Sequence, residues 1–253
     1  MTSRPHIHNI FFDLGSTLMY YDGAWPEALL ESAHQLGDAL EQAGYRLDWH
    51  PFLEEFHSRM NAYFVKRDKE FLEYTTEFIL KTQLADFGHP DVPIDVVRGA
   101  LAKMYAVTQA HWHIEQDTLP TLEALKKAGF RLGLISNAGD AADANTLIDK
   151  AEIRPYFQTI LISAEVGYRK PAARIFEMAL EEMKAIPEES LMVGDLLQAD
   201  VVGAHNQGMR AVWIARRVDT PENRALAGQI KPDGIIESLA ELPPLVERWN
   251  ATR

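Results

Sequence analysis

The sequence of 253 residues contains no cysteine. This absence excludes disulfide bonds, thiolate nucleophiles, zinc–thiolate sites and iron–sulfur clusters. Basic residues are also in the minority, because 25 Lys and Arg stand against 37 Asp and Glu and give a formal net charge of −12. Binding to a nucleic acid depends on clustered cationic side chains that displace counterions, so we expect no nucleic-acid partner.

Long apolar segments are missing too. No window approaches the roughly 18 apolar residues that a membrane-spanning helix needs, and residues 1–9 contain no apolar stretch of the kind found in signal peptides. We therefore expect no membrane partner and a cytoplasmic location. The glycine-rich phosphate loop, the zinc-binding helix motif and the serine-hydrolase elbow are also absent, which argues against kinase and serine-hydrolase chemistry.

Short apolar runs that stop at polar clusters predict a parallel sheet. The expected strands cover residues 7–12, 131–135, 159–162 and 191–193. The expected helices that alternate with them cover residues 119–128, 172–184 and 200–207, and Pro171 suits a first helical position. This alternation predicts an α/β fold with a Rossmann-like three-layer core, in which the polar clusters converge at the carboxyl ends of the strands.

Residues 19–113 have a different pattern, with several amphipathic helical segments and no run typical of a strand. The expected helices cover residues 25–43, 51–69, 71–87 and 94–108. We interpret this segment as an inserted α-helical cap over the crevice. The predicted division is therefore a core domain of residues 1–18 and 114–253 and a cap domain of residues 19–113.

The polar residues at the predicted strand ends suit phosphoryl chemistry. They are Asp13, Thr17, Ser136, Asn137, Lys170, Asp195 and Asp200. Several carboxylates in one crevice repel one another unless a cation lies between them, and oxygen ligands favour Mg²⁺. A lysine and small hydroxyl groups beside such an ion suit a phosphoryl group, which a carboxylate can attack to form an aspartyl phosphate.

Four motifs in order carry a family resemblance. They read Phe-Phe-Asp-Leu-Gly-Ser-Thr-Leu at residues 11–18, Leu-Ile-Ser-Asn at 134–137, Gly-Tyr-Arg-Lys-Pro at 167–171 and Val-Gly-Asp at 193–195 followed by Asp200. With these motifs the chain resembles the haloacid dehalogenase (HAD) superfamily, in its phosphatase-like branch with a helical cap inserted after the first motif. Each motif is weak alone, and their order over nearly the whole chain makes the resemblance specific.

The resemblance implies a Mg²⁺-dependent hydrolase of a small phosphorylated metabolite, with the oligomeric state, monomer or dimer, left open. It makes Asp13 the nucleophile and a metal ligand, the carbonyl of Gly15 a second ligand and Asp195 a third. Asp200 would reach the metal through water or orient Lys170. The groups expected to bind the phosphoryl oxygens are Ser136, the Asn137 amide, Thr17 and Lys170.

Gly15 departs from the pattern of the resembling phosphatases, which carry a second Asp two residues after the nucleophile as general acid and base. Loss of such a group typically costs about 10²–10⁴ in rate, or roughly 3–5 kcal/mol of barrier. Gly15 has a purely structural interpretation as well, as a turn residue that needs a positive φ.

Several functions are compatible with this departure. The substrate could be an aryl or acyl phosphate, whose leaving group needs little protonation. Alternatively, a side chain of the cap region supplies the proton, and the candidates by location are Tyr20, Tyr21, His57, His111 and His113. A metal-independent 2-haloacid dehalogenase needs no acid because halide leaves unprotonated. Phosphonate cleavage would need a Schiff-base lysine, for which Lys66, Lys69, Lys81 and Lys103 are available. The remaining alternative is a phosphate-binding protein without turnover.

Overall fold

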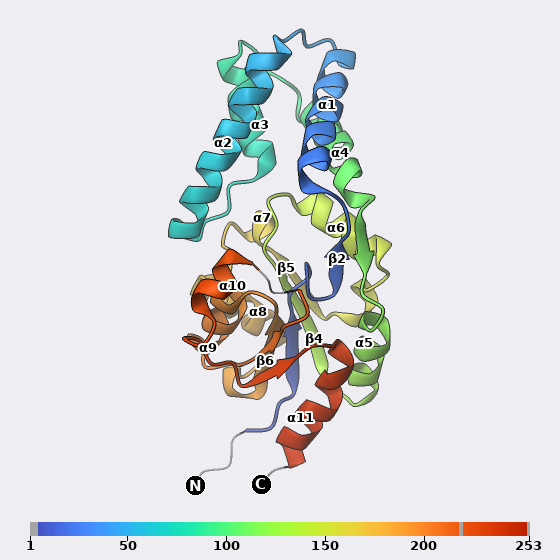
Figure 1. Cartoon of the computed structure of the whole chain (residues 1–253), viewed down its shortest axis with the longest axis vertical. Coiled ribbons are helices and arrows are strands. Elements are labelled where there is room, and N and C mark those ends of the chain that lie inside the picture. Colours follow the sequence, from blue (N-terminus) through green and yellow to red (C-terminus); the bar gives the residue numbers. More distant parts are fainter. Residues whose placement is uncertain (1–4, 218–219, 252–253) are drawn as a thin grey trace.

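A six-stranded parallel sheet forms the centre of the lower half of the molecule (Figure 1). The computed structural model describes residues 5–217 and 220–251. The sheet has the order β5-β4-β1-β6-β7-β8. Its strands are β1 (Asn9–Phe12), β4 (Arg131–Ser136), β5 (Thr159–Ile162), β6 (Ser190–Gly194), β7 (Arg210–Ile214) and β8 (Gly234–Ile236). β1 lies between β4 and β6, and buried neighbours on both sides explain the three consecutive apolar residues 10–12.

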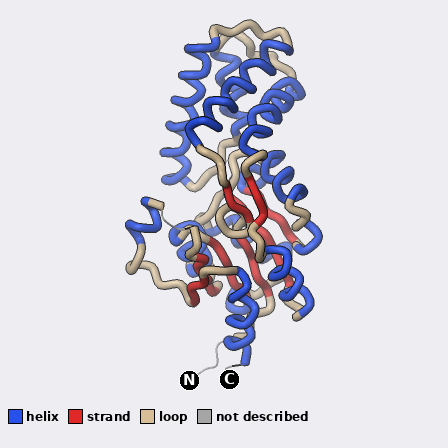
Figure 2. The backbone as a smooth tube through the Cα atoms, turned by 45° about the vertical axis from the view of Figure 1, so that its right-hand side comes forward, coloured by secondary structure: helices blue, strands red, loops and turns tan. Residues whose placement is uncertain are grey.

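Helices cover both faces of this sheet (Figure 2). The side chains of β1 alternate between two apolar cores, with Ile10 and Phe12 in one and Phe11 in the other. The first core includes residues from α5 (Thr118–Lys127), α6 (Ala141–Lys150) and α11 (Leu242–Ala251). The second includes residues from α8 (Ala173–Met183), the π-helix η3 (Leu197–Val202) and α9 (Gly203–His205). These layers confirm the predicted α/β Rossmann-like fold.

Short helices complete this part of the chain. They are α7 (Ser163–Val166), α10 (Pro221–Leu226) and the 3-10 turns η1 (Arg154–Tyr156), η2 (Pro187–Glu189) and η4 (Leu239–Glu241). In the ranges described, no helix has the length and apolar character needed to cross a membrane.

Four long helices form a separate helical unit above the carboxyl edge of the sheet (Figure 1). They are α1 (Trp25–Gln42), α2 (Trp49–Glu70), α3 (Thr76–Asp86) and α4 (Ile94–Gln109). α1 packs on α4 and α2 packs on α3, and the four share an apolar core that includes Leu36, Phe52, Leu80 and Leu101. The helices arise from the amphipathic segments that the sequence shows.

The expectation that residues 19–113 contain no strand is wrong at both ends of this segment. β2 (Met19–Tyr21) and β3 (Trp112–Ile114) pair as a two-stranded antiparallel ribbon that leads into and out of the helical unit. Strands of three residues are too short to show an alternating pattern.

Three helix starts also differ from the predictions. α3 begins at Thr76 instead of residue 71, with the Thr75 side chain accepting a hydrogen bond from the Phe78 amide at 3.1 Å. Pro171 is not the first residue of a helix, since α8 begins at Ala173. The helix expected over residues 200–207 is a π-helix from Leu197 that continues as a short α-helix.

Candidate active site

The carboxyl ends of β1, β4 and β6 lie next to one another, and the predicted site residues follow from them. Phe12 is in register with Leu134 and Val193, so Asp13 comes beside the ends of both neighbouring strands. The Asp13 amide donates to the Val193 carbonyl at 2.9 Å. Ser136 is the last residue of β4, and Asp195 comes directly after β6. Adjacent parallel strands thus bring together motifs that are far apart in the sequence.

Lys170 is the central cation of this cluster. Its side chain is 1% exposed, and its Nζ lies 2.6 Å from Asp13 Oδ1 and 2.7 Å from Asp200 Oδ1. Asn137 fixes the lysine backbone, because Asn137 Oδ1 accepts from the Lys170 amide at 2.8 Å and Asn137 Nδ2 donates to the Lys170 carbonyl at 3.0 Å. The other Asp200 oxygen accepts from the Leu196 amide at 3.0 Å. Asp200 therefore faces Lys170 with one oxygen and a backbone donor with the other.

The electrostatics of the cluster leave surplus negative charge. Burial raises the pKa of Asp13 to about 6, although the Lys170 charge acts in the opposite direction. Burial and the charges of Asp13 and Asp200 raise the pKa of Asp195 well above its usual value. Burial disfavours a charged lysine, yet the two carboxylates raise the pKa of Lys170. One ammonium group among three carboxylates is a setting that a further cation would stabilise.

The donor set fits a magnesium ion of the kind that keeps several waters. Among the described residues no group of three or more His, Asp or Glu side chains is arranged to hold a metal. Mg²⁺, however, is commonly bound by only one or two carboxylates together with water and substrate oxygens. Those two carboxylates would be Asp13 and Asp195, since the charge of Asp13 raises the pKa of Asp195. The Gly15 carbonyl would be a backbone ligand.

In the loop after Asp13, the backbone conformation of Gly15 is not the one expected for a turn glycine. Ser16 has the positive φ, at 56°, and Gly15 has none, so the view of Gly15 as a positive-φ turn residue is wrong. A Cβ atom on Gly15 would instead lie 3.3 Å from Cη2 of Trp112, an indole on β3. Thr17 is fully buried, and its hydroxyl has no hydrogen-bond partner within the protein. That hydroxyl therefore keeps an unused hydrogen bond.

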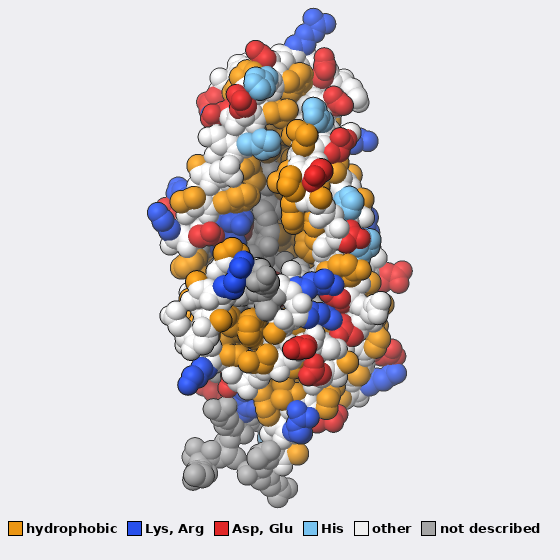
Figure 3. Space-filling view, in the orientation of Figure 1, with side chains coloured by type: hydrophobic (Ala, Val, Ile, Leu, Met, Phe, Trp, Pro, Cys, Tyr) orange, Lys and Arg blue, Asp and Glu red, His pale blue; other side chains and the backbone are white. Residues whose placement is uncertain are grey.

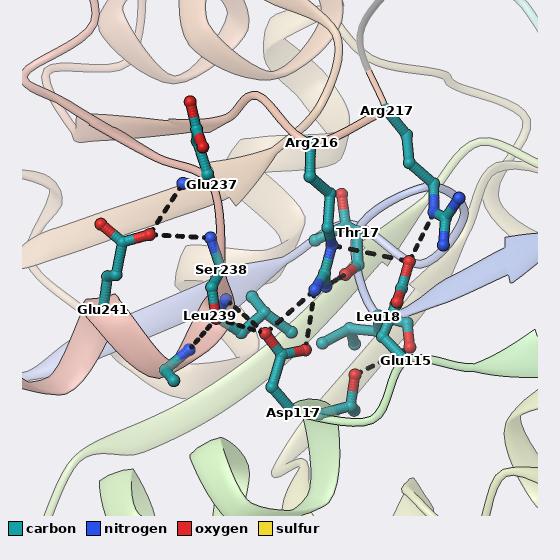
Figure 4. A network of polar contacts seen from close by, with 12 residues as sticks. Thr17, Leu18, Glu115, Asp117, Arg216, Arg217, Glu237, Ser238, Leu239 and Glu241 are labelled. Carbon is teal, nitrogen blue, oxygen red and sulfur yellow. Dashed lines mark hydrogen bonds and ion pairs between the residues drawn. The ribbon is translucent and has the colours of Figure 1, made fainter.

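A network of polar contacts holds the carbonyls that follow this loop (Figure 4). Arg216 donates to the Thr17 carbonyl at 3.0 Å and makes two bonds of 2.9 Å to the Asp117 carboxylate. Burial would raise the pKa of Asp117, but hydrogen bonds from Ser238 and Arg216 hold it below its usual value. The next carbonyl, of Leu18, accepts from the Glu115 amide at 3.0 Å. The sequence contains no motif that signals this network.

The family is decided by a match to the model of haloacid dehalogenase-like hydrolases, which covers residues 7–208. The chain belongs to this family. Asp13, Gly15, Thr17, Ser136, Asn137, Lys170, Asp195 and Asp200 all lie inside the matched range.

Individual proteins related to this HAD-like hydrolase differ in described activity. It is 35% identical over 130 residues to a glyceraldehyde 3-phosphate phosphatase of Methanothermobacter thermautotrophicus, covering 51% of this chain and 57% of the relative. It is 41% identical over 124 residues to a phosphoserine phosphatase of Thermus thermophilus, covering 48% and 49%. The chain thus spans about half the length of these relatives. A crystal structure of a 2-haloacid dehalogenase from Pseudomonas syringae matches with a TM-score of 0.67 and 27% identity, over 96% and 99% of the two chains.

A large cavity separates the helical unit of the HAD-like hydrolase from the sheet edge. Its volume is about 860 Å³, and Gly15, Ser136 and Asn137 lie on its wall at the active-site end. Of the proton donors considered from the sequence, His57 lines the cavity, whereas Tyr20, Tyr21, His111 and His113 are not among its lining residues. The four lysines considered for a Schiff base do not line it either. Among the described residues that line the cavity, Arg67 is the only lysine or arginine.

Sequence reasoning missed two acidic residues, one on the cavity wall and one buried between the helical unit and the sheet side. Asp143, on the first turn of α6, lines it, and burial raises the pKa of this carboxyl to about 6. Glu73, on the α2–α3 loop, reaches from the helical unit to the sheet side and accepts a hydrogen bond from Ser163 at 2.6 Å. The same Ser163 hydroxyl accepts from the amide of Ala138, next to the predicted phosphate-binding residues. Glu73 thus connects the helical unit with the active-site loop.

Proposed function

We propose that this HAD-like hydrolase is a Mg²⁺-dependent phosphatase of small phosphorylated compounds that uses Asp13 as its nucleophile. The observation that carries the proposal is the buried Lys170, whose ammonium lies within 2.7 Å of both Asp13 and Asp200, beside a third carboxylate on Asp195. Phosphatase relatives that match half of the chain support the same activity.

The reaction would proceed in two halves. In the first, a carboxylate oxygen of Asp13 attacks the phosphorus, a new P–O bond forms, and the leaving oxygen departs with the electron pair of the bond that breaks. In the second, water attacks the phosphorus, the bond to Asp13 breaks, and inorganic phosphate is released with the carboxylate restored. The Lys170 ammonium, 2.6 Å from Asp13, lowers the pKa of this carboxyl against the effect of burial and so favours the ionised form that attacks.

The remaining residues of the site would hold the phosphoryl group. Lys170, the free Thr17 hydroxyl, Ser136 and the amide of Asn137 would donate to its oxygens and stabilise the charge in the transition state. Bound Mg²⁺, held by Asp13, Asp195 and the Gly15 carbonyl, would neutralise part of the negative charge on the phosphoryl group. Asp200, with both oxygens engaged, would position Lys170.

The helical unit would act as a cap over this site. We place the core domain at residues 1–18 and 114–253 and the cap domain at residues 19–113, with the β2–β3 ribbon as the connection. The cavity between the two would hold the leaving group, and closure would exclude water during the first half of the reaction.

The decisive experiment measures phosphate release from para-nitrophenyl phosphate with and without Mg²⁺. Its leaving group needs little protonation, so Gly15 should not prevent turnover. We expect Mg²⁺-dependent activity that Asp13→Asn abolishes. Asp91→Asn, a matched change at an exposed site outside the cluster, should leave activity unchanged. Activity that persists in Asp13→Asn would contradict the mechanism, and circular dichroism of each variant checks that it is folded.

A second candidate function is a metal-independent 2-haloacid dehalogenase. Gly15 favours it, since a halide needs no proton donor, and so does the likeness to the Pseudomonas syringae dehalogenase structure at 27% identity. Against it stands a cavity of about 860 Å³, which is large for an acid of two or three carbons. Halide release from chloro- and bromo-acids that is insensitive to EDTA would decide for this candidate. Tight binding of Mg²⁺ and phosphate without any turnover would instead indicate a binding protein.

A further inference from the structure

Two helices of the cap carry apolar side chains that line the cavity and remain exposed. Trp25, Leu29 and Leu30 on α1 line the cavity and are 47%, 51% and 60% exposed, and Phe64 on α2 lines it as well. At their far ends the same helices bury their apolar side chains in the shared core, as Leu36 does. Figure 3 shows hydrophobic side chains on both sides of the groove between the helices. Exposed apolar patches of this kind mark interaction sites, among them ligand-binding grooves.

Aromatic rings concentrate at the end of the cavity nearest the nucleophile. The Trp112 indole lies where a side chain at position 15 would be, with Cη2 3.3 Å from the position of a Cβ on Gly15. Tyr21 packs edge-on against Trp112, with ring centroids 5.6 Å apart, and stacks on Trp25 with centroids 4.0 Å apart. Trp112 and Trp25, which both line the cavity and pack against Tyr21, therefore offer contacts to a flat ring.

We propose that the substrate is a phosphate monoester of an aromatic alcohol, with the ring of the leaving group in this cavity against Trp112 and Trp25. The inference rests on the proposed phosphatase function and narrows its substrate class. Two features agree on it. Trp112 and Trp25 on the cavity wall provide contacts for a ring, and the missing acid at Gly15 favours leaving groups that depart unprotonated.

The chemistry of the leaving group explains the second feature. Asp13 displaces the aryl oxygen from phosphorus, and the oxygen keeps the electron pair and later takes a proton from water. A phenolate, with a pKa of about 10 as in tyrosine, is far more stable than an alkoxide, whose pKa is near the roughly 15.7 of water. An alkyl phosphate therefore needs the general acid that the site lacks, and an aryl phosphate does not.

The first test compares kcat/KM for 2-naphthyl phosphate, phenyl phosphate, glycerol 3-phosphate and acetyl phosphate, in the wild type and in Asp13→Asn. We expect phenyl phosphate to exceed glycerol 3-phosphate by at least ~10²-fold because it needs no acid. The second ring of 2-naphthyl phosphate should add at least ~10-fold by filling the apolar cavity. All of this activity should require Asp13.

The second test uses two matched variants of exposed apolar residues in the cap. Leu30→Gln changes a residue that lines the cavity and is 60% exposed, and Val65→Gln changes one that is 61% exposed and does not line it. We expect Leu30→Gln to lower kcat/KM for 2-naphthyl phosphate several-fold more than for phenyl phosphate. Val65→Gln should change neither value.

The outcomes separate this inference from the proposed function. Asp13-dependent turnover that favours glycerol 3-phosphate or acetyl phosphate would overturn the aryl substrate and leave the phosphatase in place. Equal values for the naphthyl and phenyl esters, or equal effects of the two glutamine variants, would also overturn it. A lack of Asp13-dependent turnover of every ester would overturn both proposals together.

Discussion

Replacing Gly15 with aspartate should restore the missing acid, and the structure indicates what opposes it. The new Cβ would lie 3.3 Å from Trp112 Cη2, tighter than ordinary van der Waals contact, so the indole must move by a few tenths of an ångström. Trp112 also packs against Tyr21, which limits that movement. We therefore expect Gly15→Asp alone to give a partial gain in kcat for alkyl phosphates. The double variant Gly15→Asp with Trp112→Phe, in which a single ring replaces the two-ring indole, should give the full gain.

The gain should depend on the leaving group. A general acid is worth about 10²–10⁴ in rate, or roughly 3–5 kcal/mol, for an alkoxide and almost nothing for para-nitrophenolate. The assay is kcat for glycerol 3-phosphate and para-nitrophenyl phosphate in the wild type, both single variants and the double variant. Trp112→Phe alone controls for the loss of the indole. An equal gain on both substrates, or no gain on glycerol 3-phosphate in the double variant, would refute the idea that Gly15 marks a lost acid.

Three further predictions concern charge and the contact between cap and core. The folded-state pKa of Asp143, about 6, lies above its ordinary 3.8, so folding disfavours the ionised carboxyl, and the penalty is present above pH 6 and absent below about pH 4. Asp143→Asn should raise the free energy of unfolding at pH 7.5 by up to ~3 kcal/mol and leave it unchanged at pH 3.5, as urea denaturation would show; an equal effect at both pH values would contradict this. Glu73→Ala removes the acceptor for Ser163 and should lower kcat/KM about 10-fold, whereas Glu73→Gln, which keeps an acceptor oxygen, should recover most of it in the same assay. Mg²⁺ should raise the melting temperature of the wild type and have little effect on Asp195→Asn, because the ion relieves repulsion between buried carboxylates; an equal rise in both would place the ion elsewhere.

The central strands could be predicted from the sequence because a parallel sheet buries them on both faces. Residues 10–12 and 191–193 are apolar throughout and are followed by Asp13 and by Gly194 and Asp195, which indicates both the strand and its carboxyl end. β7, Arg210–Ile214, has a run of the same kind that the prediction did not include. β8, Gly234–Ile236, lies at the edge with Ile235 exposed, and three residues of that kind carry no usable pattern.

The residues of the candidate site likewise fall into those that short motifs predict and those that only long-range contacts bring together. Asp13 and Asp195 follow strands and could be predicted from short motifs. Glu73 and Ser163 are 90 residues apart, and Arg216 and the Thr17 carbonyl are 199 apart, so both contacts depend on the tertiary packing of distant segments. Such pairs have no spacing rule in one sequence, and only the three-dimensional structure reveals them.

The contact between Gly15 and Trp112 connects the chemistry with the choice of substrate. In the proposed phosphatase, a glycine at position 15 stands where an acid would be, and it also leaves room for the indole to approach the loop after Asp13, with Cη2 3.3 Å from the position of a Cβ. An aspartate there would protonate a poor leaving group but would push against that aromatic wall. The same position therefore decides between an acid for alkoxide leaving groups and a ring surface for aromatic ones. If the reasoning holds, the double variant that gains activity on glycerol 3-phosphate should lose its preference for 2-naphthyl over phenyl phosphate.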